Sequence, residues 1–242
     1  MQSKKILITG ATSGIGLALA KKCIEQGNEV IITGRNQEKL DSVAEELGSK
    51  AYLADSADLT QLVQLGKSLQ NDNVILDGVV LNAGVFYPNS FAEMTPEDFD
   101  KTIAINTKGP FFTLQALLPS LATSASVVFI SSIVVYKGFS GCSVYAASKA
   151  AFEAAIRVLN VELANHGVRI NTIRPGITAT EIHAKAGMSA EQQQGTFDSL
   201  KTTPLGRELQ SNDHLGAILY LLDDASKALR NATIDIEGGF TL

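Results

Sequence analysis

The chain has 242 residues, of which 45% are hydrophobic and 19% charged, a length sufficient for one sizeable core. Its formal net charge is −5 and no run of Lys and Arg exceeds two residues, which excludes a general nucleic-acid binder. No apolar stretch approaches the roughly 18–20 residues of a membrane span, and no signal-peptide apolar segment follows Met1. We therefore expect a cytoplasmic protein with neither a nucleic-acid nor a membrane partner.

Short apolar runs rich in Val and Ile alternate with helical patterns along the chain. These runs are continuously apolar, which is typical of strands buried on both faces of a parallel sheet. We predict α/β fold class and one Rossmann domain over residues 1–242, with a doubly wound seven-stranded parallel sheet and helices on both faces. The predicted strands are Ile6–Thr9, Val30–Thr33, Ala51–Ala54, Gly78–Leu81, Val127–Ile130, Arg169–Ile173 and Thr233–Ile236.

A glycine-rich turn follows the first predicted strand and precedes a predicted helix at Leu17–Gln26. Glycines there allow a sharp turn, close approach of a phosphate to the backbone, and tight contact of helix and strand. The free N–H groups at the helix start would face the anion. This placement favours dinucleotide binding over a purely structural turn, with expected contacts from Gly10, Thr12, Ser13, Gly14, Ile15 and Gly16.

The end of the second strand reads Thr33-Gly34-Arg35-Asn36 and has no carboxylate. An acidic residue there would bind the ribose 2′-hydroxyl of NAD and repel a 2′-phosphate. A guanidinium pairs bidentately with phosphate, so Arg35 predicts NADP(H) as the cofactor, with a solvated loop arginine as the alternative. At the end of the third strand, Asp55 could accept a hydrogen bond from the adenine amino group or begin a helix.

A candidate chemical centre lies in the middle of the chain. Tyr145 and Lys149 are four residues apart and share one face of a helix, and Ser132 ends the fifth strand region. A fixed ammonium beside the phenol, together with a positively charged nicotinamide, would lower the tyrosine pKa from its ordinary value near 10. Tyr145 would then exchange a proton with the substrate oxygen while Ser132 holds that oxygen and stabilises its developing charge.

Together these motifs resemble the classical short-chain dehydrogenase/reductase family over essentially the whole chain. Thr9–Gly16 matches its T-G-x-x-x-G-x-G turn, Asn82-Ala83-Gly84 its N-A-G signature, and Tyr145-Ala-Ala-Ser-Lys149 its Tyr-x-x-x-Lys motif. The resemblance implies a catalytic set of Asn106, Ser132, Tyr145 and Lys149, with Ser131 as the alternative serine. It further implies cofactor contacts from Asp55, Ser56, Asn82, Ala83, Gly84, Tyr145, Lys149, Pro175, Gly176, Ile177 and Thr180.

Three of these assignments carry a more specific role by the same resemblance. Asn106 would hold a water in a proton relay, Lys149 would bind the nicotinamide ribose hydroxyls, and Thr180 would contact the nicotinamide carboxamide. One position departs from the pattern, because Ser13 stands where many NADP-preferring members carry a basic residue. Arg35 must therefore provide most of the discrimination between NADP and NAD.

The expected activity is that of an NADP(H)-dependent oxidoreductase acting on CH–OH donors, which transfers a hydride between the nicotinamide and a carbonyl or secondary alcohol. A ketone reductase, 3-oxoacyl-thioester reductases included, is the leading interpretation. The alternatives are an NAD(H)-dependent alcohol, sugar or steroid dehydrogenase and a non-catalytic NADP-sensing protein. Apolar candidates for substrate contacts, which could instead line the core or a subunit contact, are Phe86, Tyr87, Val134, Tyr136 and Phe139.

Two further features bear on the site and on assembly. The polar segment 178–205 follows the carboxyl end of a strand, where open α/β sheets bind ligands; it is either a substrate lid or a surface insertion, and its His183 could touch substrate. Small residues on predicted helices Pro96–Leu121 and Val144–Asn165, the helices through which the family commonly assembles, favour a homodimer or homotetramer. Cys23 and Cys142 lack metal-ligand spacing, so we expect no metal.

Overall fold

The computed structural model describes residues 3–242 and contains one seven-stranded sheet. All strand pairs are parallel, and the order is β3-β2-β1-β4-β5-β6-β7. The sequence-predicted fold class is confirmed, and each predicted strand is present, although β5 begins six residues before the predicted Val127. The strands are β1 (Lys5–Ile8), β2 (Glu29–Gly34), β3 (Lys50–Leu53), β4 (Leu76–Leu81), β5 (Leu121–Ile130), β6 (Arg169–Pro175) and β7 (Thr233–Ile236).

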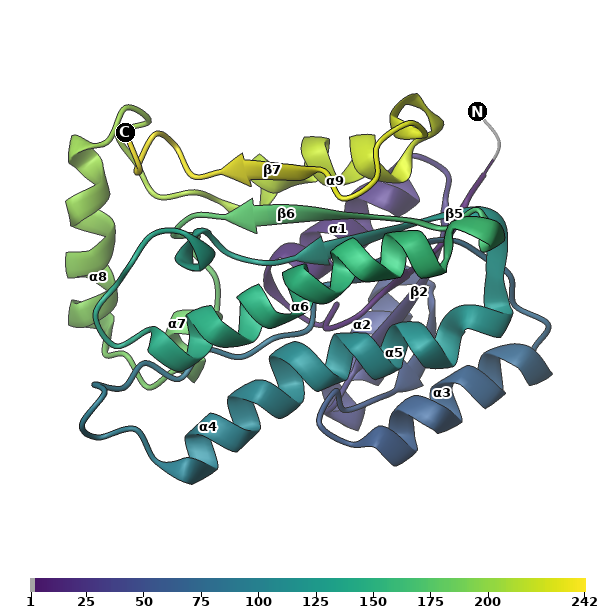
Figure 1. The fold of residues 1–242 in the computed structure, drawn as a ribbon, viewed down its shortest axis with the longest axis horizontal. Coiled ribbons are helices and arrows are strands. Elements are labelled where there is room, and N and C mark those ends of the chain that lie inside the picture. Colours follow the sequence, from purple (N-terminus) through teal and green to yellow (C-terminus); the bar gives the residue numbers. More distant parts are fainter. Residues whose placement is uncertain (1–2) are drawn as a thin grey trace.

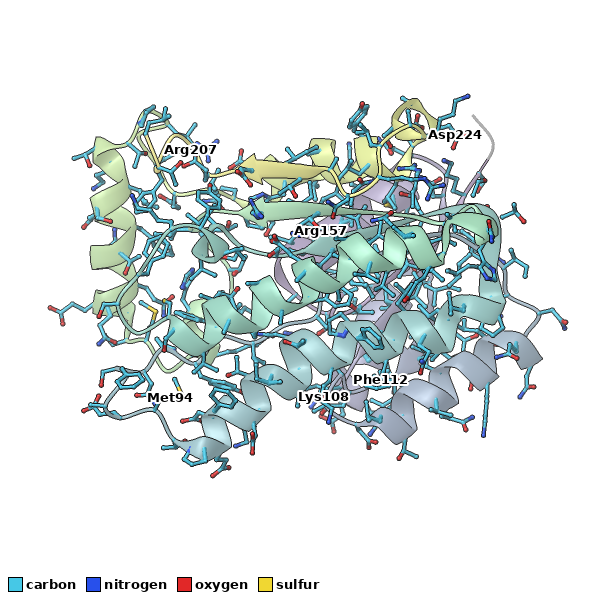
Figure 2. All side chains as sticks on the ribbon, in the orientation of Figure 1. Met94, Lys108, Phe112, Arg157, Arg207 and Asp224 are labelled. Atoms are coloured by element: carbon cyan, nitrogen blue, oxygen red, sulfur yellow. The ribbon has the colours of Figure 1, made fainter. Side chains whose placement is uncertain are left out.

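Helices cover both faces of the sheet (Figure 1). Successive strand residues point to opposite faces, so Leu7 packs into the core on one side while Ile6 and Ile8 pack into the core on the other. Phe112, labelled in Figure 2, packs against the first of these cores from its helix. That face carries α3 (Leu59–Asn71), α4 (Pro96–Ile103), α5 (Gly109–Leu117) and α6 (Ser143–Glu162), and the opposite face α1 (Gly14–Glu25), α2 (Gln37–Leu47) and α9 (Leu215–Leu222).

The strand order reverses between β1 and β4, and the segments that follow these two strands are braced against each other. The Thr9 hydroxyl accepts hydrogen bonds from the backbone N–H groups of Asn82 and Ala83, each at 3.0 Å. The Asn82 side-chain amide donates to the Thr9 carbonyl oxygen at 2.9 Å. In open α/β sheets a crevice forms at such a reversal, which is where ligands bind.

The predicted helix Pro96–Leu121 is wrong in its interior and at its end. A π-helical turn at Ala104–Lys108 separates α4 from α5, and Leu121 is the first residue of β5. Pro110 has no N–H to close an α-helical bond to the Asn106 carbonyl, four residues earlier, which favours an irregular turn there. The first half of β5 is rich in small and polar residues, so no apolar run marked its start.

The segment 178–205 forms α7 (Ile182–Lys185) and α8 (Ala190–Ser199), followed by a single 3-10 turn. A capping box starts α8: the Ser189 hydroxyl accepts from the Gln192 N–H at 3.1 Å, and the Gln192 side-chain oxygen accepts from the Ser189 N–H at 2.8 Å. Both helices stand at the end of the molecule toward which the β6 and β7 arrows point (Figure 1). The segment therefore lies beyond the carboxyl edge of the sheet, and a lid and an insertion remain alternative interpretations of it.

A buried histidine anchors the start of this segment. The His214 Nε2 atom lies 2.9 Å from the Thr178 hydroxyl, and the imidazole has no exposed surface. Its Nδ1 atom has no hydrogen-bond partner within the described part of the chain. Burial lowers the pKa of His214 to about 4, because the charged form would lose its hydration.

We expect His214 to make the stability of the protein fall by about 2 kcal/mol between pH 7 and pH 5. In the unfolded chain its pKa is near 6.5, so acid protonates that state first and favours unfolding; the contribution is complete above this value and is lost as the pH falls toward about 4. Urea unfolding at pH 7 and pH 5 should show that the free energy of unfolding falls less between these pH values in His214→Gln than in wild type. The exposed His166→Gln is the control and should keep the wild-type difference. Equal differences in all three proteins would contradict the assignment.

Candidate active site

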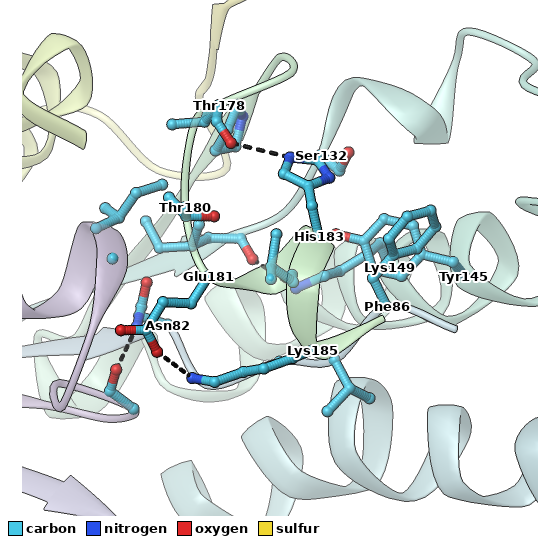
Figure 3. A pocket seen from close by; sticks show the side chains of 18 of the residues that line it. Asn82, Phe86, Ser132, Tyr145, Lys149, Thr178, Thr180, Glu181, His183 and Lys185 are labelled. Carbon is cyan, nitrogen blue, oxygen red and sulfur yellow. Dashed lines mark hydrogen bonds and ion pairs between the residues drawn. The ribbon is translucent and has the colours of Figure 1, made fainter. Parts of the chain in front are cut away.

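A cavity of about 1010 Å³ extends along the carboxyl edge of the sheet, from the glycine-rich turn to the start of α6 (Figure 3). Its wall contains most of the residues that the sequence marks as functional, although they are far apart in the chain. They are Gly10, Thr12, Ser13, Gly14, Ile15, Arg35, Asp55, Ser56, Asn82, Ala83, Gly84, Phe86, Ser132, Phe139, Tyr145, Lys149, Pro175, Gly176, Ile177 and Thr180.

Two of the predicted site residues lie behind this wall. Gly16 supports the turn, because a Cβ there would lie 2.5 Å from the Asn82 Nδ2 atom. Asn106 is fully buried, and its side-chain oxygen accepts from the Val85 N–H while its Nδ2 donates to the Val85 carbonyl, both at 2.9 Å. The same Nδ2 lies 3.1 Å from the hydroxyl of Ser148 on α6. This one amide thus ties the segment after β4 to α6.

Tyr136 is not part of the cavity wall, in contrast to the prediction of a substrate contact. The 3-10 turn Ile133–Val135 follows Ser132 and directs Val134 to the cavity. Tyr136, beyond that turn, is 45% exposed and its ring lies 5.3 Å from the Arg174 guanidinium. An outward-facing aromatic side chain after a tight turn has no signature in the sequence that separates it from an inward-facing one.

Tyr145 is held in a dry, partly aromatic environment. Its ring centroid lies 5.0 Å from that of Phe86, and burial raises the pKa of Tyr145 to about 12, although the neighbouring Ser132 hydroxyl acts in the opposite direction. The lowering expected from the sequence needs the positive charge of an oxidised nicotinamide as well as the ammonium, so it stays a prediction for the cofactor complex. Desolvation of the phenolate is the largest cause of this rise, and the Lys149 ammonium lies 5.9 Å from the ring centroid.

Lys149 is 3% exposed, and its ammonium donates to the Ile130 carbonyl oxygen at 2.8 Å. Burial lowers its pKa to about 8, with Glu153 acting weakly in the opposite direction. A Cβ on Gly84 would lie 3.2 Å from this ammonium, so the glycine keeps the space around it open. The result is a basic group that exchanges protons near neutral pH at the floor of the cavity.

Of the two adjacent serines, Ser132 is the one beside Tyr145. Its hydroxyl influences the tyrosine pKa and accepts a hydrogen bond from the Val134 N–H at 3.3 Å. The Ser131 hydroxyl is buried and has no hydrogen-bond partner within residues 3–242, although Ser131 also borders the cavity. The geometry therefore favours Ser132 over Ser131.

The glycine-rich turn has the form required to hold a diphosphate. Gly10 has a φ of +64°, and a Cβ on it would lie 2.9 Å from the Ala83 Cα atom, so only a bare backbone fits. Ser13 precedes α1 without forming a side-chain cap, and the first turn of α1 holds no acidic residue. The N–H groups at the start of this helix are thus uncapped and face the cavity, which suits a phosphate anion.

The adenosine end of the cavity contains Arg35, Asp55 and Ser56. Asp55 does not begin the helix, because α3 starts at Leu59 and Asp58 caps it; the Asp55 Oδ1 accepts from the Ala57 N–H at 2.9 Å in the preceding loop, and the residue borders the cavity. Arg35 is exposed and forms no ion pair with any described residue. Arg35 thus lies directly after β2, where the sequence has no carboxylate, and its guanidinium is not engaged by an acidic side chain among the described residues.

Among the wall residues that the sequence reasoning did not single out are Glu181, Lys185 and Cys142. Glu181 and Lys185 reach the wall from the segment that contains α7, and Cys142 lies beside Tyr145. The i,i+4 spacing of Glu181 and Lys185 was the available signal, since such a pair shares a helix face. Cys142 carried no signal, because a single cysteine without ligand spacing resembles any other small residue.

Residues 3–242 contain neither a candidate membrane span nor a candidate metal site. No helix there combines the length and the hydrophobicity needed to cross a membrane. Nor does any group of three His, Cys, Asp or Glu side chains come together in a way that could hold a metal ion.

Residues 10–241 match a family model described as enoyl-(acyl carrier protein) reductase. Oxidoreductase asL5 of Sarocladium schorii is 33% identical over 99% of this chain and 96% of its own length. A 3-oxoacyl-[acyl-carrier-protein] reductase of Thermotoga maritima is 31% identical over 100% and 99%. The solved structure of a blue fluorescent protein from a metagenomic library, in complex with NADPH, is 26% identical with a TM-score of 0.88, covering 99% of this chain and 98% of that one.

Each of these similarities spans nearly the whole length of this chain and of the protein compared with it. They coincide with a glycine-rich turn at the sheet reversal and with a buried tyrosine and lysine at the far end of one cavity. The chain accordingly belongs to the classical short-chain dehydrogenase/reductase family of NAD(P)-dependent oxidoreductases.

Proposed function

We propose that the protein is an NADP(H)-dependent reductase that interconverts a ketone and a secondary alcohol. The observation that carries this proposal is a single cavity with Ser132, Tyr145 and Lys149 at one end and the unpaired Arg35 at the other. The NADPH-bound structural neighbour supports the choice of NADP, as does the absence of a carboxylate at Thr33–Asn36. Bound NADPH would supply the hydride to the carbonyl carbon.

Tyr145 acts as the general acid in the proposed reduction. The phenol is protonated at neutral pH and so has a proton to give; because burial raises its pKa, transfer to the substrate oxygen would depend on a nearby positive charge that makes it a stronger acid. The Ser132 hydroxyl donates a hydrogen bond to the same oxygen and stabilises that charge. In the direction of alcohol oxidation, Tyr145 takes the proton back, which needs the phenolate and becomes easier when a positive charge lies nearby.

Lys149 and Asn106 complete the proton path. A lysine whose pKa is about 8 can return a proton toward Tyr145 after each turnover, and in this proposal its ammonium would also bind the ribose hydroxyls. The Asn106 side-chain amide is committed to Val85 and Ser148, so its part in a water relay falls to its main-chain carbonyl. Pro110 cannot donate to that carbonyl, which leaves it open to another donor such as water.

The substrate side of the cavity favours a moderately hydrophobic ketone, and a 3-oxoacyl thioester fits this description. Phe86 lies against Tyr145, and Phe139 stacks on Phe240 with ring centroids 5.7 Å apart. Val134 and Met188 add further apolar wall. The similarity to the Thermotoga maritima relative, a 3-oxoacyl-[acyl-carrier-protein] reductase, supports this class.

We expect NADPH to be preferred over NADH, and Arg35→Ala to remove most of that preference. The guanidinium forms charge-assisted hydrogen bonds to a 2′-phosphate, so its loss should lower kcat/KM with NADPH by about 10- to 100-fold and leave NADH nearly unchanged. The measurement is cofactor oxidation with a panel of 3-oxoacyl thioesters, sugars, steroids and small ketones. Lys108→Ala, whose side chain lies outside the cavity wall, is the control. An Arg35→Ala protein that retains its NADPH preference would refute the assignment.

We further propose a cytoplasmic homo-oligomer that assembles through α4, α5 and α6. Apolar side chains on these helices are exposed, namely Phe99, Phe111, Val158 and Val161, the last at 76%. Exposed apolar side chains gathered on neighbouring elements are typical of protein–protein contacts. Free Cys23 and Cys142 suit a reducing compartment. A monomer in sedimentation at micromolar concentration would contradict the assembly.

A further inference from the structure

An ion-pair cluster joins α2 to α7 at the edge of the cavity. The Glu181 carboxylate lies 2.8 Å from the ammonium of Lys185 and 3.1 Å from that of Lys39. Figure 3 draws Glu181 and Lys185 in the pocket with their contact marked. Lys39 belongs to the first turn of α2, four residues after Arg35. A carboxylate thus sits between two cations supplied by separate parts of the chain.

Lys185 has a second contact, which connects the cluster to the glycine-rich turn. Its ammonium donates to the Ser13 hydroxyl at 3.2 Å. Ser13 is the position in the turn at which a basic side chain would be expected in an NADP-binding protein of this kind, and here it is neutral. Lys185, 172 residues after Ser13 in the sequence, therefore places an ammonium beside the position in the turn that carries no charge of its own.

Arg35, Ser13, Glu181 and Lys185 all border the same cavity. Lys39 and Lys185 hold the carboxylate between them, and Arg35 forms no ion pair with a described residue. An anion with more charge and more acceptor oxygens than a carboxylate would satisfy these cations better. A phosphate monoester is such an anion, and beside it the Glu181 carboxylate would be repelled.

We propose that Lys185 is a ligand of the adenosine 2′-phosphate, and that Glu181 occupies the place of this phosphate between Lys185 and Lys39 until the cofactor binds. The proposal rests on the proposed use of NADP(H). The exchange is feasible because all three side chains are at least 42% exposed, so each ion pair is weak and Glu181 can turn into water. Binding of the phosphate would also tie α7 to the glycine-rich turn.

The test is equilibrium binding of adenosine 2′,5′-bisphosphate and of 5′-AMP by calorimetry, which requires no turnover. Wild type should bind the bisphosphate more tightly than 5′-AMP. Lys185→Ala should lower the affinity for the bisphosphate by about tenfold, since a charge-assisted hydrogen bond to the 2′-phosphate is lost. The affinity of this variant for 5′-AMP should equal that of wild type. Glu181→Gln should raise the affinity for the bisphosphate by about threefold, because the competing carboxylate has been removed.

The matched control is Lys201→Ala, which removes an exposed lysine from the same segment, paired with Asp198 and outside the cavity wall. Both ligands should bind this variant as they bind wild type. If wild type prefers the bisphosphate but Lys185→Ala leaves that preference intact, Lys185 is not a ligand, and the use of NADP(H) still stands. Glu181→Gln that weakens the bisphosphate would overturn the competing role of Glu181. Equal binding of both ligands by wild type would overturn the 2′-phosphate site itself.

Discussion

Tyr145→Phe should lower kcat/KM for ketone reduction with NADPH by between about 10² and 10⁴, the usual contribution of a general acid. The substitution removes one hydroxyl and keeps the ring that packs on Phe86 at 5.0 Å, so fold and cavity shape should remain. Affinity for NADPH, followed by fluorescence, should change by less than a few-fold. The loss should therefore appear in kcat, which steady-state kinetics with the best substrate of the panel will measure.

The matched control for this variant is Tyr136→Phe. Tyr136 lies on the same segment of chain but outside the cavity, beside Arg174. Its hydroxyl should be dispensable, and kcat/KM should stay within twofold of wild type. If Tyr145→Phe retained wild-type turnover, the proposed acid would be wrong. If Tyr136→Phe lost turnover as well, the placement of Tyr136 outside the site would need revision.

Gly16→Ala should destabilise the fold by about 1–3 kcal/mol, the usual cost of overpacking, and should also weaken NADPH binding. The added Cβ would lie 2.5 Å from the Asn82 Nδ2 atom and 2.8 Å from the Gly10 carbonyl oxygen. Neither neighbour can move freely, because Asn82 is itself bonded to the backbone of Thr9 and Gly10. Thermal unfolding and a cofactor titration would measure both effects.

Gly216→Ala provides the comparison, since Gly216 is also a helical glycine but has nothing within 4 Å of its Cβ position. There the substitution restricts the unfolded chain and improves helix propensity, so stability should hold or rise by up to about 1 kcal/mol. Opposite signs for the two variants are the expected result. A Gly16→Ala protein as stable as wild type would show that the turn tolerates a side chain.

Much of the sheet could be predicted from the sequence because β1, β2, β4 and the second half of β5 contain short continuous apolar runs, whereas β6 and β7 carry polar residues between their apolar ones. A strand buried on both faces has apolar side chains at successive positions, as in Ile6–Ile8. Such a run can be recognised in the sequence without knowing which strands lie beside it. The turn and the Tyr145–Lys149 pair were predictable for a similar reason. Each is a local arrangement whose spacing alone sets its geometry.

The interruption of the helix before α5 was not predictable in the same way. Apolar residues continue at helical spacing through Ala104–Lys108, and a π turn changes the hydrogen-bond partners without changing that spacing much. Pro110 was the one local sign. Its missing N–H removes the usual α-helical donor to the carbonyl of Asn106, four residues earlier.

Charge and burial in the cavity depend on contacts between distant segments, so the sequence could not settle them. Burial raises the pKa of Tyr145 to about 12 although Lys149 lies one helical turn away. The contact of Lys185 with Ser13 joins two segments that no spacing rule relates. Such effects follow from three-dimensional packing, which composition and periodicity do not encode.

The Asn106 amide has a consequence for how this enzyme can acquire new substrates. It fastens the chain after Val85 to Ser148, and the Ser148 hydroxyl donates to the Tyr145 carbonyl oxygen at 2.7 Å. The phenol and its aromatic neighbour are thus fixed to the body of the sheet, whereas the outer wall of the pocket belongs to 178–205. Insertions or exchanges in that outer wall can reshape the space for the substrate while the reacting groups keep their mutual geometry. Residues that contact the substrate can therefore change while the positions of the reacting groups stay the same.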